Sequence, residues 1–131
     1  MSEHQTPPTI LIVEPDDQVR PALIHNLRRW GYRVIVALDE EDATERVKNG
    51  GLQADVILLN QMQQSIDQFV NIGRSIRQSA ERSTNTPIVI MAERYGNDLE
   101  GQDVQVGERE YVTYLEDGQQ LMNLLHNLCP I

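Results

Sequence analysis

Cysteine is nearly absent from this chain of 131 residues, where Cys129 is the only one. A lone cysteine excludes an intramolecular disulfide framework and a zinc site built from several thiolates. The apolar runs are short, far below the roughly 20 residues of a membrane-spanning helix. The residues after Met1 are polar and lack the apolar stretch of a signal peptide. These absences predict a cytoplasmic chain without a membrane-spanning segment.

Basic residues are also scarce. The sequence contains 11 Lys and Arg against 20 Asp and Glu, which gives a formal net charge of −9 and a pI near 4.6. Such a surface repels the phosphate backbone of nucleic acids and anionic membranes, so neither is expected as a partner. We expect the excess acids to be spread over helix caps and surface loops, where they favour a basic or mixed-charge protein partner.

Five short apolar segments alternate with stretches of helical periodicity. They are rich in Val, Ile and Leu, as in parallel strands buried on both faces. Because parallel strands need right-handed helical crossovers, the alternation predicts an α/β fold of the (βα)₅ type. Its doubly wound, five-stranded parallel sheet has the flavodoxin-like order 2-1-3-4-5. The single domain spans 9–131 behind a flexible tail at 1–8, with strands at 9–13, 34–37, 55–59, 88–91 and 111–115.

Acidic residues precede three of the predicted helices as N-caps. Asp16 or Asp17 would cap the first helix, Asp39 the second and Asp117 the last. The segment 93–109 is the least regular part of the chain because it contains three glycines. Each glycine costs a helix about 1 kcal/mol relative to alanine. We therefore expect only a short or frayed helix there.

Ligands of doubly wound sheets bind outside the carboxyl ends of the strands. A flavin or nucleotide site would need a Gly-rich turn after the first strand, and this chain has none there. A flavodoxin-like binder of nucleotides or other small molecules is kept as an alternative. The residues at the strand ends are Glu14, Pro15 and Asp16, then Asn60, Ala92 and Tyr114.

The ordered set of segments resembles the CheY-like receiver domain of bacterial two-component response regulators. Residues 10–14, 55–60, 87–92 and 110–112 are similar to that family's first, third, fourth and fifth strands. The resemblance implies a phosphorelay chemistry in which an aspartate after the third strand attacks a phosphodonor. Mg²⁺ held by acidic side chains neutralises charge during the transfer, while a Lys and a Thr or Ser contact the phosphoryl group.

Compared with that chemistry, this chain is degenerate. The phosphoacceptor position is Asn60, whose amide has no negative charge and negligible nucleophilicity. An amide can instead satisfy neighbouring loop groups by hydrogen bonding. The resemblance assigns the other positions to Glu14, Pro15 and Asp16 (acidic pocket), Ala92 (switch Thr or Ser), Tyr114 (Lys) and Tyr111 (switch aromatic).

These departures imply a pseudo-receiver that acts by protein–protein interaction without aspartyl phosphorylation and is not an enzyme. No cofactor or metal site is expected, and Mg²⁺ binding would be weak or absent, because a metal cage needs more than one well-placed carboxylate. Tyr114 either fills the vacated pocket or extends outward from its strand. We interpret Tyr111 as a partly buried strand aromatic.

In the family, partner contacts commonly use the fourth helix, fifth strand and fifth helix, which here implies residues 98–128. A homodimer remains open. An alternative function is that of a regulatory subunit controlling a partner's transcriptional output. We expect that partner to supply the effector, because the chain ends at Ile131, directly after the last predicted helix.

Overall fold

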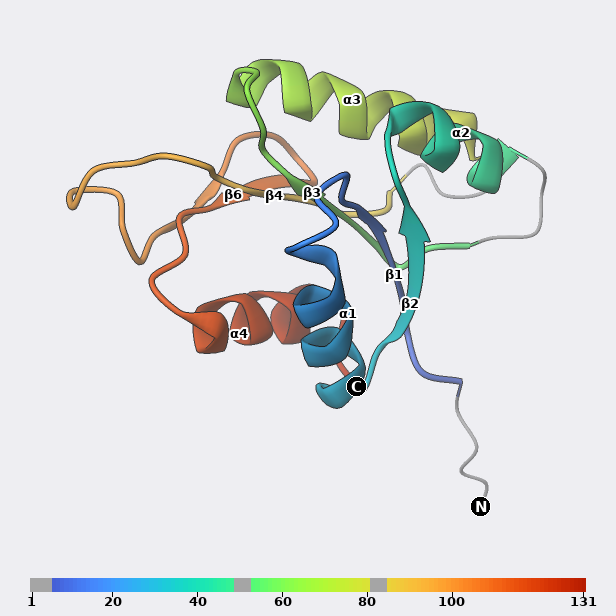
Figure 1. Cartoon of the computed structure of the whole chain (residues 1–131), viewed down its shortest axis with the longest axis horizontal. Helices are drawn as coiled ribbons and strands as arrows, with labels where there is room; N and C mark the ends of the chain where they lie inside the picture. The colour runs from blue at the N-terminus through green and yellow to red at the C-terminus, as the bar shows by residue number, and fades with distance from the viewer. Residues whose placement is uncertain (1–5, 49–52, 81–84) are drawn as a thin grey trace.

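A six-stranded sheet with the order β2-β1-β3-β4-β6-β5 forms the centre of the computed structural model (Figure 1). The structure describes residues 6–48, 53–80 and 85–131, so the first five residues of the predicted tail lie outside it. All strand pairs are parallel except β5 with β6. The predicted order of the five parallel strands is confirmed, with β6 as the fifth. The strands are β1 (Thr9–Val13), β2 (Arg33–Ala37), β3 (Val56–Asn60), β4 (Ile88–Met91), β5 (Asp103–Gln105) and β6 (Glu110–Thr113).

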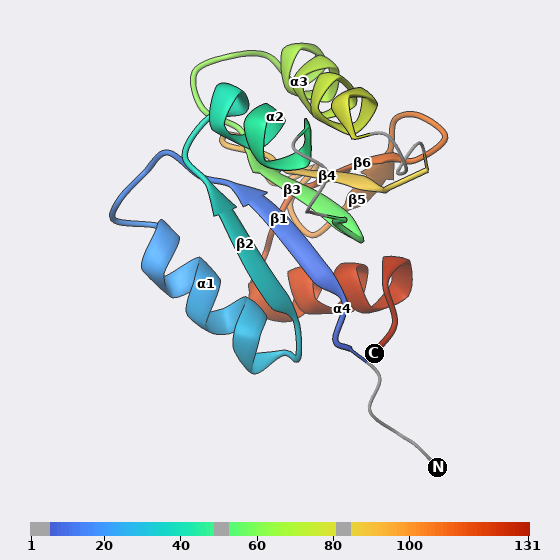
Figure 2. The same ribbon diagram turned by 90° about the vertical axis from the view of Figure 1, so that its right-hand side faces the viewer.

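Helices cover both faces of this sheet (Figures 1 and 2). On one face α1 (Arg20–Arg29) and α4 (Gly118–Leu128) pack on alternate strand residues such as Ile12. On the other face α2 (Glu40–Lys48) and α3 (Ile66–Ser79) pack on the residues between them. Because both sides of the central strands are covered, these strands are apolar except at their ends, where β1 begins with Thr9 and β3 ends with Asn60. In the described ranges, no helix is long and apolar enough to cross a membrane.

Two of the three predicted acidic caps are correct. Asp39 Oδ1 accepts the backbone N–H of Asp42 at 2.8 Å, and Asp117 Oδ1 accepts that of Gln120 at 3.0 Å. The prediction for α1 is wrong, because its N-cap is Val19 and no side chain caps it. The two acids expected there form other contacts: Asp16 accepts a hydrogen bond from Gln18, and Asp17 pairs with Arg20.

The expected helix within 93–109 is also wrong. This segment forms a turn and then β5, which pairs antiparallel with β6. Gly101 has a φ of +87°, in the left-handed region that favours glycine, and its position ends the turn. The hydroxyl of Thr113 and the amide of Gln120 both donate to Asp103 Oδ1, at 2.6 and 2.9 Å. The pairing of β5 with β6 and these hydrogen bonds outweigh the weak helix propensity of the segment. The partner surface expected over 98–128 therefore contains β5, β6 and α4, and no helix precedes β5 in it.

Candidate functional site

Strand ends distant in the sequence meet at the carboxyl edge of the sheet, and the loops after β3, β4 and β6 leave it toward the left of Figure 1. The parallel register pairs Val13 with Leu59, Asn60 with Met91, and Met91 with Thr113. This register aligns the residues that end or follow β1, β3, β4 and β6, which are Glu14, Asn60, Ala92 and Tyr114.

Glu14 and Asn60 form the centre of this edge. The Glu14 side chain is fully buried, and its Oε1 accepts a hydrogen bond of 2.8 Å from Asn60 Nδ2. Its Oε2 accepts the backbone N–H of Asp16 at 3.3 Å. An ionised carboxylate can only accept hydrogen bonds, so the amide must turn its NH₂ group toward Glu14. Both oxygens of Glu14 are therefore already hydrogen-bonded within the protein.

The carboxyl group of Glu14 has a raised pKa. Burial is the main cause, because it removes water from the ionised form. The hydrogen bonds from Asp16 N–H and Asn60 lower the pKa in part, but they do not reverse the effect of burial. Glu14 is thus a buried acid beside a neutral amide.

The two acids after Pro15 do not join Glu14 to form a carboxylate cluster. Asp16 Oδ1 accepts the backbone N–H of Gln18 at 2.8 Å, while exposed Asp17 forms an ion pair with Arg20. Arg20 also donates to the backbone oxygen of Glu14 at 2.9 Å. These local bonds organise the turn before α1 without an N-cap from either acid. Pro15 contributes no ligand atom from its side chain.

The positions assigned to the switch residues have other contacts. Ala92 extends the pairing of β4 with β6, because its backbone N–H donates to the backbone oxygen of Thr113 at 3.0 Å. The Tyr114 ring meets the edge of the Tyr95 ring, with centroids 5.4 Å apart, so it anchors the loop after β4. Tyr111 is half-buried on the face covered by α1 and α4.

The loop after β3 contains polar contacts that the sequence reading missed. Gln61 Oε1 accepts the backbone N–H of Glu93 at 2.8 Å, and Glu93 Oε1 accepts that of Gln63 at 3.0 Å. Gln63 has a φ of 65°, a left-handed conformation that is uncommon outside glycine. The two reciprocal bonds tie the loops after β3 and β4 together. The only sequence signal of this link is a pair of polar side chains just beyond two neighbouring strands, Gln61 one residue after β3 and Glu93 two residues after β4.

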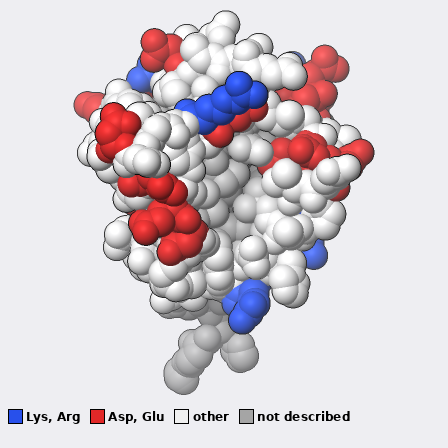
Figure 3. Space-filling view, turned by 60° about the vertical axis from the view of Figure 1, so that its left-hand side comes forward, with Lys and Arg blue, Asp and Glu red and all other residues white. Residues whose placement is uncertain are grey.

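Acidic side chains flank this edge of the sheet. The face turned toward the viewer in Figure 3 has Asp and Glu on both flanks of an uncharged depression. The basic residues on or beside the loops that follow the parallel strands are Arg94 and Arg20, and Arg20 is paired with Asp17. The acids on or beside these loops are Asp16, Asp17, Asp39, Glu40, Glu93, Asp98, Glu100, Glu116 and Asp117.

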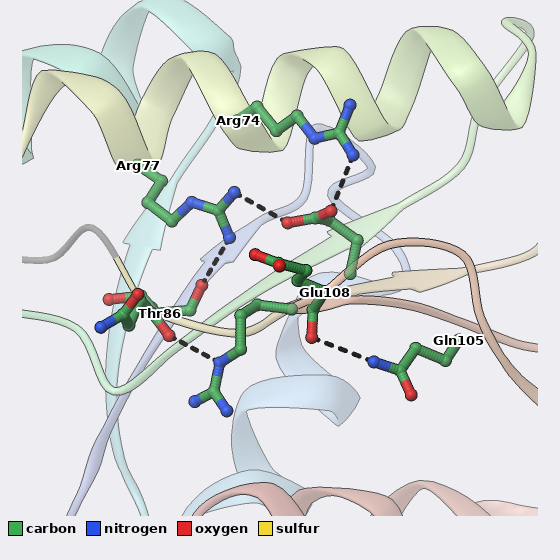
Figure 4. Close-up of polar contacts among 8 residues, drawn as sticks. Arg74, Arg77, Thr86, Gln105 and Glu108 are labelled. Carbon is green, nitrogen blue, oxygen red and sulfur yellow. Dashed lines mark hydrogen bonds and ion pairs between the residues drawn. The ribbon is translucent and has the colours of Figure 1, made fainter.

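A second buried acid, Glu110, lies at the opposite end of the sheet. Its two carboxylate oxygens accept hydrogen bonds from Arg74 and Arg77 of α3, each at 2.7 Å (Figure 4). Arg77 also donates to the backbone oxygen of Thr86 at 3.1 Å. Burial raises the pKa of Glu110, but the two arginines outweigh burial and hold the pKa below its ordinary value. This ion-paired cluster joins α3 to β6, and sequence reasoning missed the pairing.

Within the described ranges, no three His, Cys, Asp or Glu side chains come together as a group that could hold a metal ion. At the carboxyl edge, the arrangement offers one buried carboxylate, one amide and backbone groups. It can bind through hydrogen bonds and surface charge.

A curated relative is similar to this chain over most of its length. The sequence is 35% identical over 100 residues to the transcriptional regulatory protein AfsQ1 of Streptomyces coelicolor. The match covers 76% of this chain but only 40% of AfsQ1, so the chain spans about two fifths of that relative's length. No family model matches the sequence.

Solved structures with the same fold include receiver domains and response regulators. The receiver domain of a sensor histidine kinase from Pseudomonas aeruginosa PAO1, with a magnesium ion coordinated in its active site cleft, superposes with a TM-score of 0.66. It is 20% identical, and the match covers 94% of this chain and 98% of that one. A response regulator from Thermotoga maritima has the same TM-score at 17% identity, with the same coverage of both chains. At these identities the likeness shows the fold.

Proposed function

We propose that this chain, which belongs to the receiver-domain family of response regulators, is a pseudo-receiver. It transmits a signal by binding a partner protein and takes no phosphoryl group on residue 60. The observation that carries this proposal is the hydrogen-bonded pair of Asn60 and Glu14. The pair occupies the edge at which receiver chemistry would take place.

Asn60 cannot act as the nucleophile. Phosphoryl transfer to a receiver needs a carboxylate that attacks the phosphorus atom. The amide of Asn60 carries no charge, and its nitrogen is committed to Glu14 at 2.8 Å. A phosphodonor at this edge would therefore meet no competent acceptor.

Mg²⁺ does not fit the residues of this edge. The ion needs near-octahedral oxygen coordination, usually including carboxylates. Both oxygens of Glu14 already accept hydrogen bonds, Pro15 offers no side-chain ligand, and Asn60 turns its donor toward Glu14. The Pseudomonas receiver coordinates magnesium in its cleft, whereas we expect none to be held here.

The chain also lacks side chains to report an occupied site. Ala92 has no hydroxyl group to move toward a phosphoryl oxygen. Tyr114 has no cationic head, and its ring is packed against Tyr95. Without these groups, phosphate occupancy would have no route to the rest of the fold. Partner binding remains the output that the surface can support.

Incubation with acetyl phosphate and Mg²⁺, followed by intact-mass measurement, tests the proposal. A phosphorylatable receiver serves as the positive control. We expect no mass gain for the wild type or for Asn60→Asp, because the variant restores the acceptor alone. Beryllofluoride with Mg²⁺ should leave the amide NMR shifts of the carboxyl edge unchanged. A stable phosphoryl adduct on the wild type would overturn the proposal.

A second function, control of transcription through a partner, is favoured by the match to AfsQ1. That relative is a transcriptional regulatory protein, and the matched part is two fifths of it. The net charge of −9 opposes direct contact with DNA. In a gel-shift assay, this chain alone should leave the mobility of the DNA unchanged. Adding the partner captured with it should retard the DNA band.

A further inference from the structure

A hollow of about 280 Å³ opens beside Asn60, between α3 and the start of α2. Leu59, Phe69 and Ile72 contribute apolar walls. Asp39 and Glu40 also line the hollow, and both are exposed to solvent. The hollow therefore combines an apolar interior with acidic groups that reach water.

The size of the hollow limits what can occupy it. Sites for drug-sized ligands and cofactors measure roughly 300–1,000 Å³. At about 280 Å³, this hollow lies just below that range and suits a single long side chain. Side chains that fill such pockets are often the main anchors of protein interfaces, and arginine is prominent among them.

Charge narrows the choice of side chain. No ion pair among the described residues engages Asp39 or Glu40. The basic residues on or beside the strand-end loops are Arg94 and Arg20, and Arg20 is paired with Asp17. Because Asn60 turns its NH₂ toward Glu14, its Oδ1 is left to accept a hydrogen bond. An apolar interior beside two carboxylates and an amide oxygen matches an aliphatic stem that ends in several fixed donors.

We propose that this hollow receives an arginine from a basic segment of the partner protein. The aliphatic stem packs on Phe69 and Ile72, and the guanidinium donates to Asp39, Glu40 and Asn60 Oδ1. Lysine has a compact, strongly hydrated charge without the planar fork, so it fits less well. The surrounding acids attract such a segment and repel anionic ones. This inference rests on the proposed function, since it names the chemistry of the partner which that function requires.

Peptide titrations test the choice of arginine. A capped Gly-Leu-Arg-Leu-Gly peptide is added to ¹⁵N-labelled protein, in parallel with peptides that carry lysine or the uncharged isostere citrulline. We expect saturable shift changes at Asp39, Glu40 and 62–69 with the arginine peptide. Binding should be at least tenfold weaker with citrulline and several-fold weaker with lysine. Equal binding of the citrulline peptide would overturn the proposal.

Variants of α2 separate the hollow from general charge attraction. The double variant Asp39→Asn with Glu40→Gln should weaken arginine binding about tenfold, and asparagine at 39 still caps the helix. The matched control, Glu41→Gln with Glu45→Gln, removes the same charge from exposed positions outside the hollow lining and should change affinity less than twofold. Equal weakening by both pairs would refute a specific arginine site.

The outcome also distinguishes the two proposals. If the arginine peptide does not bind, while the protein still resists acetyl phosphate, the arginine site is refuted and the pseudo-receiver function stands. If the protein gains a phosphoryl group, the proposed function fails whatever the peptide does. Amide-shift dispersion and thermal melting of each variant confirm that the fold is retained.

Discussion

Two buried glutamates at opposite ends of the sheet have opposite electrostatic surroundings. Glu14, at the carboxyl edge, is fully buried beside the neutral amide of Asn60, and its pKa is raised. Glu110, at the start of β6, is 3% exposed and paired with Arg74 and Arg77, and its pKa is lowered. At the Glu110 end, two arginines balance the buried negative charge. At the Glu14 end, the buried carboxyl has a neutral amide as its side-chain partner.

The difference separates a structural role from a functional one. A buried charge with two arginines holds α3 against the sheet, because breaking such a pair leaves charge uncompensated. A buried acid whose pKa stays raised, although Arg20 is nearby, marks a candidate functional edge. In a phosphorylated receiver, Mg²⁺ would supply the missing positive charge. Here the group next to the Glu14 carboxyl is the neutral amide of Asn60.

The largest expected effect comes from Glu110→Gln. The variant leaves two guanidinium groups around a neutral amide, so it should lower the free energy of unfolding by about 3 kcal/mol. Urea denaturation measures this loss. Exposed Glu108→Gln, two residues away, is the matched control and should stay within about 0.5 kcal/mol of the wild type. Similar losses for both variants would contradict a structural role for the cluster.

Asn60→Asp should have the next largest effect. The substitution places two carboxylates within hydrogen-bonding distance, so we expect a loss of about 2 kcal/mol at pH 7. The loss should shrink as the pH falls and one of the two carboxyls is protonated. Asn97→Asp makes the same change on an exposed loop residue and should be nearly neutral. Unchanged stability of Asn60→Asp at pH 7 would show that the edge already supplies compensating positive charge.

The pH dependence of stability should have opposite signs for the two glutamates. Because the folded pKa of Glu14 is raised, its stabilising contribution is present below its ordinary value of 4.5 and lost as the pH rises through the folded pKa. Glu14→Gln should therefore gain stability relative to wild type on going from pH 4 to pH 7. The gain should be smaller than the loss caused by Asn60→Asp.

Glu110 should show the reverse trend. Its folded pKa is lowered, so its contribution is present above 4.5 and lost as the pH falls through the folded pKa. The wild type's advantage over Glu110→Gln should decline in acid. Urea midpoints measured across this pH range for both variants test the pair of signs. Parallel profiles for the two variants would contradict the contrast between the two ends.

The smallest effect is expected from Arg74→Gln. The Arg74 side chain is 47% exposed, and Arg77 would remain on Glu110 after the substitution. A partly exposed ion pair contributes about 0.5 kcal/mol, so the loss should be near that value. Arg77→Gln should cost more, because that side chain is only 15% exposed. Equal losses in urea denaturation would mean that solvent exposure does not distinguish the two arginines.

The succession of apolar runs was sufficient to predict the five parallel strands and their order. Strands covered on both faces must be apolar throughout, and right-handed crossovers leave few ways to connect them. The same reasoning placed Glu14, Asn60, Ala92 and Tyr114 at one edge, because the carboxyl ends of parallel strands point the same way. The pattern of apolar runs along the sequence thus predicts the layers of the fold and the edge at which the site lies.

The contacts within and around the site depended on the folded structure. Asn60 and Glu14 are 46 residues apart, and Arg74 lies 36 residues before Glu110. The weak helix propensity of 93–109 did not reveal that part of this segment would form β5. That strand pairs with the edge of β6 that the parallel strands leave free. Burial can be inferred from composition along the chain, but the partner of a buried charge depends on register and side-chain geometry. Those are set when distant segments pack together.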